Sequence, residues 1–128
     1  MPLTKENTYT TKDIYKLPNG KRAELIDGQI YDMAPPNRRH PKLVMDLSAV
    51  IYNFIHVNNG FCEVYPAPFA VFLNKDDNYY VEPDISVIRD TDKLNEYGCS
   101  GALDWIIEIV SPSSQRMDYQ IKLSDFLA

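Results

Sequence analysis

Two apolar segments that each carry a carboxylate constrain the fold of this chain most strongly. Residues 80–88 alternate in the manner of a β-strand and place Asp84 on the same face as Glu82. Residues 105–110 are apolar throughout except Glu108. Such runs are typical of strands covered on both faces, where an ionised carboxylate is costly unless a cation or several donors compensate it. Asp84 and Glu108 on neighbouring central strands therefore predict a shared divalent metal ion.

Length and composition predict a single domain. The chain has 128 residues, of which 45% are hydrophobic and 24% are charged, so it is long enough for one domain with a real core. No apolar run approaches the roughly 20 residues of a membrane span, and the N-terminus has no signal-peptide core. We therefore expect a cytoplasmic protein. Cys62 and Cys99 lack metal-type spacing, and in a reducing compartment we expect them to be free thiols.

The net charge limits the kind of nucleic-acid binding that can be expected. The formal charge is −5 and the isoelectric point is about 4.9, which argues against a broad, non-specific nucleic-acid binder. It does not exclude an enzyme with acidic metal ligands and a local basic rim. The basic residues do cluster, in three groups: Lys16, Lys21 and Arg22; Arg38, Arg39 and Lys42; and Arg116 and Lys122.

The N-terminal half predicts a short helix, a hairpin and a long helix. Thr10 or Thr11 can cap a helix that ends near Leu17. Residues 22–33 predict a hairpin, because their central Asp-Gly pair is a strong two-residue turn signal. Residues 37–56 predict a helix that an Asn-Asn-Gly sequence ends with a left-handed cap. Its apolar residues at helical spacing are Leu43, Leu47, Val50, Ile51, Phe54 and Ile55.

The C-terminal half predicts the remaining strands and a last helix. Strands are expected at 62–65 and 69–73, followed by the two acid-bearing segments. Residues 90–101 predict a loop that has room for one helical turn. A helix follows residues 111–114, which offer N-caps. The order predicts an α/β fold with a mixed β-sheet flanked by helices in one domain, 1–128. The chain stops inside the last helical pattern, so we expect the C-terminal strand or strands to be missing.

Several of these segments together closely resemble the Uma-type restriction endonuclease family, which belongs to the PD-(D/E)XK nuclease superfamily. The resemblance covers nearly the whole chain, with its segments in order and at sensible spacing. The matching segments are Glu24-Leu25-Ile26-Asp27-Gly28, Met33-Ala34-Pro35-Pro36 ahead of His40, Pro83-Asp84-Ile85-Ser86-Val87, Asp104 to Ser114, and Arg116, Asp118 and Lys122-Leu123.

The resemblance implies a restriction-endonuclease-like α/β fold and metal-dependent hydrolysis of DNA phosphodiesters, with Mg²⁺ or Mn²⁺ as cofactor. Asp84 falls on the first metal-binding carboxylate of the superfamily and Glu108 on the acidic residue of its second motif. Val110 stands where the usual lysine would be, and Lys122 in the following helix is at the matching position instead. Glu24 matches an acidic residue before the hairpin turn that is expected to face the same cleft.

These residue types suit phosphodiester cleavage. A magnesium ion held by Asp84 and Glu108 would lower the pKa of a nucleophilic water and act as a Lewis acid. Lys122 would orient the water or neutralise the developing oxyanion. Glu24 could hold a second metal or a metal-bound water. For substrate binding the candidates are His40, Gln115 and Arg116, although His40 could also be structural, and Gln115 and Arg116 could instead cap the last helix.

Other functions remain open from the sequence. Asp84 could cap a turn or pair with a lysine, Glu24 could belong to a surface ion pair, and Lys122 could be a solvated helix residue. The chain could then be a catalytically inactive or truncated relative that acts as an interaction module. An incomplete sheet exposes backbone groups and an apolar helix face, which favours a homodimer. A third possibility is a metal-dependent phosphohydrolase that acts on a substrate other than DNA.

Overall fold

The structure is a computed structural model, and it describes residues 8–33, 37–73 and 77–110. The predicted last helix lies outside these ranges. The described helices and strands, in chain order, are α1 (Thr11–Tyr15), β1 (Ala23–Ile26), β2 (Gln29–Asp32), α2 (Arg39–Val57), β3 (Glu63–Pro66), β4 (Ala70–Phe72), β5 (Ile85–Ile88), the 3₁₀ turn η2 (Thr91–Lys93), β6 (Leu94–Asn95), β7 (Gly98–Ser100) and β8 (Trp105–Ile107).

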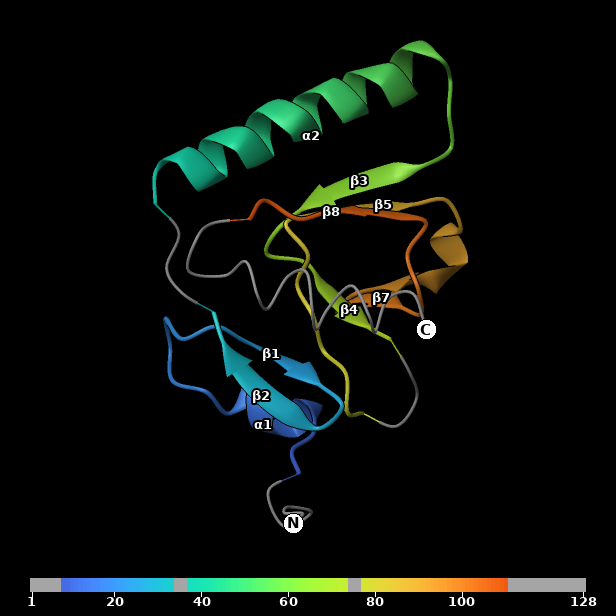
Figure 1. Ribbon diagram of the computed structural model, residues 1–128. Coiled ribbons are helices and arrows are strands. Elements are labelled where there is room, and N and C mark those ends of the chain that lie inside the picture. Colours follow the sequence, from blue (N-terminus) through green and yellow to red (C-terminus); the bar gives the residue numbers. More distant parts are fainter. Residues whose placement is uncertain (1–7, 34–36, 74–76, 111–128) are drawn as a thin grey trace.

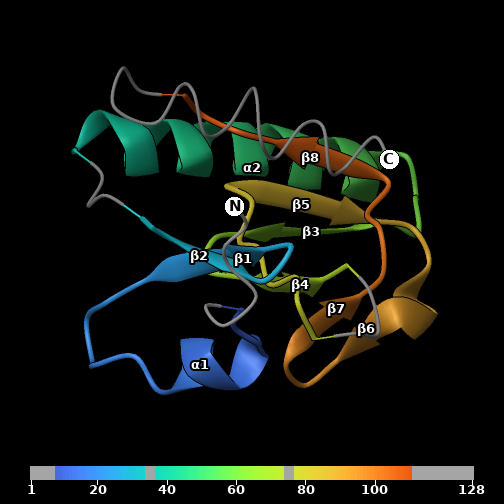
Figure 2. The same cartoon turned by 60° about the horizontal axis from the view of Figure 1, so that its bottom comes forward.

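The strands form three small sheets, which confirms the predicted mixed α/β fold. β1 and β2 make a two-stranded sheet, β3–β5–β8 is antiparallel, and in β4–β7–β6 the β4–β7 pair is parallel while the β6–β7 pair is antiparallel. Helix α2 runs along the β3–β5–β8 sheet, and the hairpin and the β4–β7–β6 sheet lie on the other side of that sheet (Figures 1 and 2). In the described part of the chain, no helix is both long and apolar enough to cross a membrane.

The hairpin and α1 follow the sequence pattern closely. Asp27 and Gly28 have φ angles of 50° and 78°, the pair of positive values that a type I′ turn needs, and β1 pairs with β2 in the register that this turn sets. At α1 the backbone N–H of Thr10 donates to Asp13 Oδ2 over 2.9 Å, which satisfies one donor at the start of the helix. Both predicted elements are confirmed.

The segment 80–88 joins the three sheets, and it is not the continuous strand that the alternation predicts. Tyr80 bridges Leu25 of β1, Val81 bridges Val71 of β4, and only from Ile85 does the segment pair as β5 with β3 and β8. Because one segment serves three sheets, every residue from 80 to 88 is buried. The prediction that both faces are covered is therefore confirmed, while its strand pairing is interrupted between Val81 and Ile85.

The prediction of a loop at residues 90–101 is only partly right. The expected helical turn is present as η2, but β6 and β7 follow it as a short hairpin. The turn between them is held by Asn95, whose Oδ1 accepts from the N–H groups of Tyr97 and Gly98 over 2.8 and 3.2 Å. Strands of two and three residues are too short to show an alternating pattern, which explains why the sequence did not reveal them.

Helix α2 begins and ends within two residues of its predicted bounds. Its end is a Schellman motif: Asn59 takes the left-handed conformation at φ 55°, and the N–H of Gly60 donates to the carbonyl of Ile55 over 2.8 Å. Only part of its apolar surface packs on the protein. Val44, which is not in the predicted set, is buried. Of the predicted apolar residues, two are half-buried, Ile51 and Ile55, and four are exposed: Leu43, Leu47, Val50 and Phe54.

Candidate active site

Asp84 and Glu108 face each other at the open end of the β5–β8 pair. Ile85 pairs with Ile107 in this antiparallel ladder, so the next step of the register brings Asp84 opposite Glu108. There the side chains take over the hydrogen bonding: the N–H of Asp84 donates to Glu108 Oε1 over 2.9 Å, and the N–H of Ile109 donates to Asp84 Oδ2 over 2.7 Å. Residues opposite each other in an antiparallel pair project to the same face, so the two carboxylates lie on one side of the sheet.

The first turn of α2 adds His40 to this pair. His40 Nε2 lies 3.0 Å from Asp84 Oδ1, and the two side chains are 24% and 13% exposed. The imidazole therefore engages one oxygen of Asp84 while the Ile109 N–H engages the other. Arg38 and Arg39, next to His40, are exposed at the same end of the helix. Of the predicted substrate-binding residues, His40 is thus in contact with a predicted metal ligand.

Glu24 reaches the same segment of chain from β1. It is 4% exposed, and its Oε2 accepts the N–H of Glu82 over 2.7 Å. Glu24 and Glu108 therefore accept the N–H groups of Glu82 and Asp84, in the stretch where no strand pairs with the segment. Pro83 between them has no N–H to satisfy. The carboxylates take the place of the carbonyls of a neighbouring strand.

Glu82 is a buried charged residue for which the sequence predicts no role. Its Oε1 accepts from Arg22 Nε over 3.0 Å and from Arg22 Nη2 over 2.5 Å, and its Oε2 accepts from the hydroxyl of Tyr80 over 2.9 Å. Burial, and next the negative charge of Glu82, raise the pKa of Tyr80 above its ordinary value. A sequence signal for Glu82 existed, since the alternation placed it on the same face as Asp84, but nothing indicated Arg22 as its partner.

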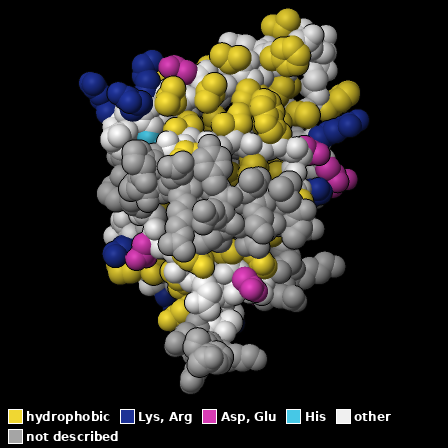
Figure 3. Space-filling model, viewed as in Figure 1, with side chains coloured by type: hydrophobic (Ala, Val, Ile, Leu, Met, Phe, Trp, Pro, Cys, Tyr) yellow, Lys and Arg dark blue, Asp and Glu magenta, His cyan; other side chains and the backbone are white. Residues whose placement is uncertain are grey.

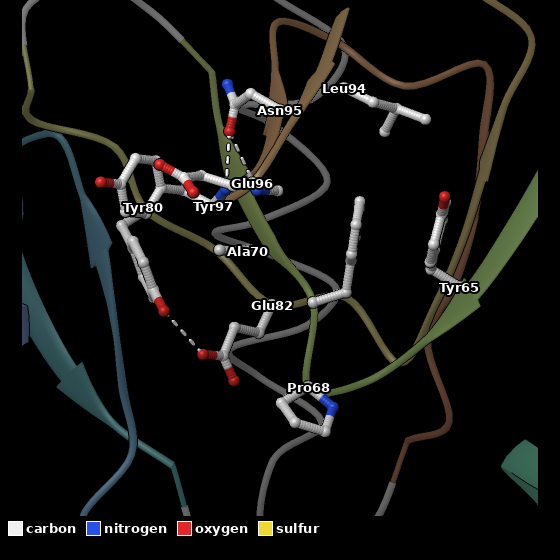
Figure 4. A pocket seen from close by; sticks show the side chains of 11 residues that line it. Tyr65, Pro68, Ala70, Tyr80, Glu82, Leu94, Asn95, Glu96 and Tyr97 are labelled. Atoms are coloured by element: carbon white, nitrogen blue, oxygen red, sulfur yellow. Dashed lines mark hydrogen bonds between the residues drawn. The ribbon is translucent and has the colours of Figure 1, made fainter. Parts of the chain in front are cut away.

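A cavity of about 420 Å³ lies beside this network and not around the Asp84–Glu108 pair. Figure 4 shows Glu82 and the ring of Tyr80 at this cavity, joined by their hydrogen bond, with Tyr97 close to Tyr80 and Tyr65 across from them. Neither Asp84 nor Glu108 belongs to its lining. The complete lining consists of Tyr65, Pro68, Phe69, Ala70, Tyr80, Glu82, Leu94, Asn95, Glu96, Tyr97 and Gly98.

The donor set at Asp84 and Glu108 fits a hard divalent cation. Magnesium is usually held by one or two carboxylates, with waters and substrate phosphate completing its octahedron, so two adjacent carboxylates are sufficient. Within residues 8–33, 37–73 and 77–110 there is no group of three or more His, Cys, Asp or Glu side chains arranged to hold a metal. The described residues thus fit a site that shares its ion with solvent and substrate, and not a closed protein cage. Lys122, Gln115 and Arg116 lie outside the described residues.

Comparison with known proteins places the chain in a family. The model of the Uma2 family, described as a putative restriction endonuclease, matches residues 11–128. The chain belongs to the Uma2 family. It is 28% identical over 103 residues to the uncharacterized protein slr1290 of Synechocystis sp., a match that covers 77% of this chain and 50% of that protein.

A solved structure is similar in fold. The crystal structure of a putative nuclease belonging to DUF820 from Anabaena variabilis matches with a TM-score of 0.65 and 23% identity, over 85% of this chain and 62% of that one. At this identity the likeness concerns the fold. The chain spans about half the length of its curated relative and less than two thirds of the solved structure.

Proposed function

We propose that this Uma2 chain is a metal-dependent endonuclease that hydrolyses phosphodiester bonds of DNA with Mg²⁺ or Mn²⁺. The observation that carries the proposal is the pair of Asp84 and Glu108 on one side of the sheet: Glu108 accepts the N–H of Asp84, and Asp84 accepts the N–H of Ile109. The family description and the nuclease-named structural relative support the same reaction class. The chain covers only 50% of its curated relative and 62% of the solved structure, so the proposal rests on the residues of this chain.

In this proposal, different residues bind the metal ion and the phosphates. Asp84 and Glu108 would hold the cation, which when bound supplies Lewis acidity and a water of lowered pKa. His40 holds Asp84 in place through Nε2, and the exposed Arg38 and Arg39 beside it offer charge-assisted hydrogen bonds to the backbone phosphates. The start of α2 adds its positive dipole end to this phosphate-facing surface.

The remaining predicted roles are part of the proposal. Glu24 would act indirectly, because its carboxylate fixes the backbone of Glu82 two residues ahead of Asp84. We retain Lys122 as the cation that stabilises the transition state, and Gln115 and Arg116 as substrate contacts. An enzyme of this kind needs no basic surface overall, which is compatible with the net charge of −5.

The test is cleavage of supercoiled plasmid DNA in the presence of Mg²⁺ or Mn²⁺. Asp84→Asn and Glu108→Gln keep an oxygen that can accept each backbone N–H but remove the negative charge, so they should abolish nicking while leaving the fold intact. Asp46→Asn is the matched control, because Asp46 is an exposed acid that pairs with Lys42 on the surface of α2. Equal nicking by the wild type and Asp84→Asn would refute the proposal.

A metal-binding measurement separates the site from the reaction. Calorimetric titration with Mn²⁺ should show binding to the wild type and to Asp46→Asn, and at least a tenfold weaker affinity for Glu108→Gln, since a charged ligand is lost. This readout needs no knowledge of the substrate.

One observation favours a second function, that of a non-catalytic module with the same fold. Glu24, Glu108 and Asp84 each accept a backbone N–H, so their burial also has a structural explanation. On that hypothesis the wild type would bind no Mn²⁺, and Asp84→Ala would lower the stability without any catalytic consequence. The predicted homodimer belongs to either function.

A further inference from the structure

A row of exposed apolar side chains runs along α2, next to the face that packs on the protein. Residues 43, 47, 50, 54 and 57 are spaced by four, three, four and three positions, so they lie on one side of a helix with 3.6 residues per turn. We call this row the α2 stripe. Its members and their exposed fractions are Leu43 (39%), Leu47 (38%), Val50 (66%), Phe54 (69%) and Val57 (79%).

The stripe is unusual for a protein surface. Single exposed apolar residues are common, but a contiguous apolar patch of several hundred Å² marks an interaction site. Figure 3 shows hydrophobic side chains gathered over α2. With about 150–250 Å² for a fully exposed large side chain, the stripe and Phe61, which is 86% exposed just after the helix, present roughly 700 Å².

We propose that the α2 stripe binds the α2 stripe of a second copy of this chain, with the two helices antiparallel. The alternating spacing of three and four is the heptad pattern through which two helices pack against each other. The patch nearly reaches the roughly 800 Å² per partner of a stable interface, and an isologous contact needs only one such surface on each copy. The proposal goes beyond the nuclease function and does not depend on it.

The charge on α2 selects the antiparallel orientation. The basic residues Arg38, Arg39 and Lys42 all lie at its start, and Asp46 is the one acidic residue between Arg39 and Val57. A parallel pair would bring the two basic ends together, at an electrostatic cost. An antiparallel pair separates them by about 28 Å, the length of a 19-residue helix, and places each beside the negative dipole end of the other helix.

This orientation also determines which residues meet. Val50 is at the middle of the stripe, so it would face its own copy across the two-fold axis. Leu43 at one end would face Val57 at the other. The two copies of His40 would lie at opposite ends of the helix pair, so both candidate active sites would stay accessible.

The first experiment measures mass in solution. The wild type should have twice the 14.7 kDa of one chain at about 100 µM, well above the micromolar dissociation constants that modest interfaces show. Phe54→Glu should shift it to the monomer with an unchanged far-UV circular dichroism spectrum. Met45→Glu is the matched control: Met45 is 64% exposed, but it lies about 140° around the helix from Val50, so it should remain dimeric.

The second experiment is disulfide cross-linking, which does not depend on a disruptive variant. It uses Cys62→Ser as the background, since the other thiol, Cys99, is fully buried. Val50→Cys should form a disulfide-linked dimer on mild oxidation. Leu43→Cys and Val57→Cys should each form little disulfide-linked dimer alone but should cross-link to each other when mixed.

Three outcomes would overturn the proposal. The first is a wild type that is monomeric at every concentration, as expected if another part of a longer polypeptide covers the stripe. The second is a dimer that Phe54→Glu and Met45→Glu affect equally. The third is efficient cross-linking of Leu43→Cys with itself, which would indicate a parallel pair.

Discussion

The ion pair between Arg22 and Glu82 offers a direct test of how the segment ahead of Asp84 is held. We predict that Arg22→Met destabilises the protein by about 2 kcal/mol. Breaking a fully buried pair by removing one partner costs about 3–5 kcal/mol, because the remaining charge stays buried. Here the side chain of Glu82 is 10% exposed but that of Arg22 is 40% exposed, so solvent screening lowers the cost. The hydroxyl of Tyr80 still donates to Glu82 in the variant.

The expected loss is large enough to measure. A domain of this length has a free energy of unfolding of roughly 6–19 kcal/mol, at about 0.05–0.15 kcal/mol per residue. A loss of 2 kcal/mol should lower the melting temperature by about 6–10 °C. Urea denaturation followed by far-UV circular dichroism gives the free energy, and an unchanged slope with denaturant would show that the compactness of both states is preserved.

A double-mutant cycle separates the pair from the individual side chains. Glu82→Gln removes the charge and keeps a similar shape, so Arg22→Met in that background should cost clearly less than it does in the wild type. The reasoning would be refuted if Arg22→Met cost less than about 0.5 kcal/mol, as an exposed ion pair does. It would also be refuted if the two substitutions were additive, because Glu82 would then gain nothing from Arg22.

Three further predictions concern the same region. Glu108→Gln should change the free energy of unfolding by less than about 1 kcal/mol, whereas Glu108→Ala should cost about 1–3 kcal/mol because a buried backbone N–H loses its acceptor. The raised pKa of Tyr80 means that its protonated hydroxyl stabilises the folded state below pH 10, and that this stabilisation is lost as the pH rises above 10. In melting experiments at alkaline pH, Tyr80→Phe should therefore lose less stability than the wild type. Gly98→Ala should lower the free energy of unfolding, measured in urea, by more than about 3 kcal/mol, because a Cβ there would lie 2.1 Å from the carbonyl oxygen of Ala70. As a control, Gly20→Ala should lower it by only about 1 kcal/mol, because Gly20 has a positive φ but nothing within 4 Å of the added Cβ.

The elements that the sequence predicted well are those whose signal is local. The Asp-Gly pair determines the β1–β2 turn, because both residues need positive φ. The apolar spacing and the Asn-Asn-Gly cap determine the extent of α2. The β6–β7 hairpin was missed because its strands are too short to alternate, and the pairing of β7 with β4, which brings Gly98 close to Ala70, joins residues far apart in the sequence.

The apolar spacing in α2 could not say which side of the helix is buried. Val50 and Ile51 belong to the same pattern, yet Ile51 is half-buried and Val50 is 66% exposed. A helix with two adjacent apolar faces carries more hydrophobic surface than one sheet can cover. Only the structure shows which apolar face of α2 packs on the protein and which one stays exposed.

The acids of the candidate site were found for a reason that the structure then explains. The sequence indicated that burying the charges of Asp84 and Glu108 would cost free energy unless a partner stabilised them, and we predicted a metal ion as that partner. The structure shows that backbone N–H groups stabilise these acids: no strand pairs with the segment 82–84, and Glu24 and Glu108 accept the hydrogen bonds of its N–H groups. An interrupted strand leaves backbone N–H groups without a carbonyl partner, and carboxylates accept hydrogen bonds from such groups well. The carboxylates that do so also place negative charge close together, and a divalent cation would bind there. Structural and metal-binding roles therefore favour the same residues, and the comparison of Glu108→Gln with Glu108→Ala separates the contribution of the charge from that of the hydrogen bond.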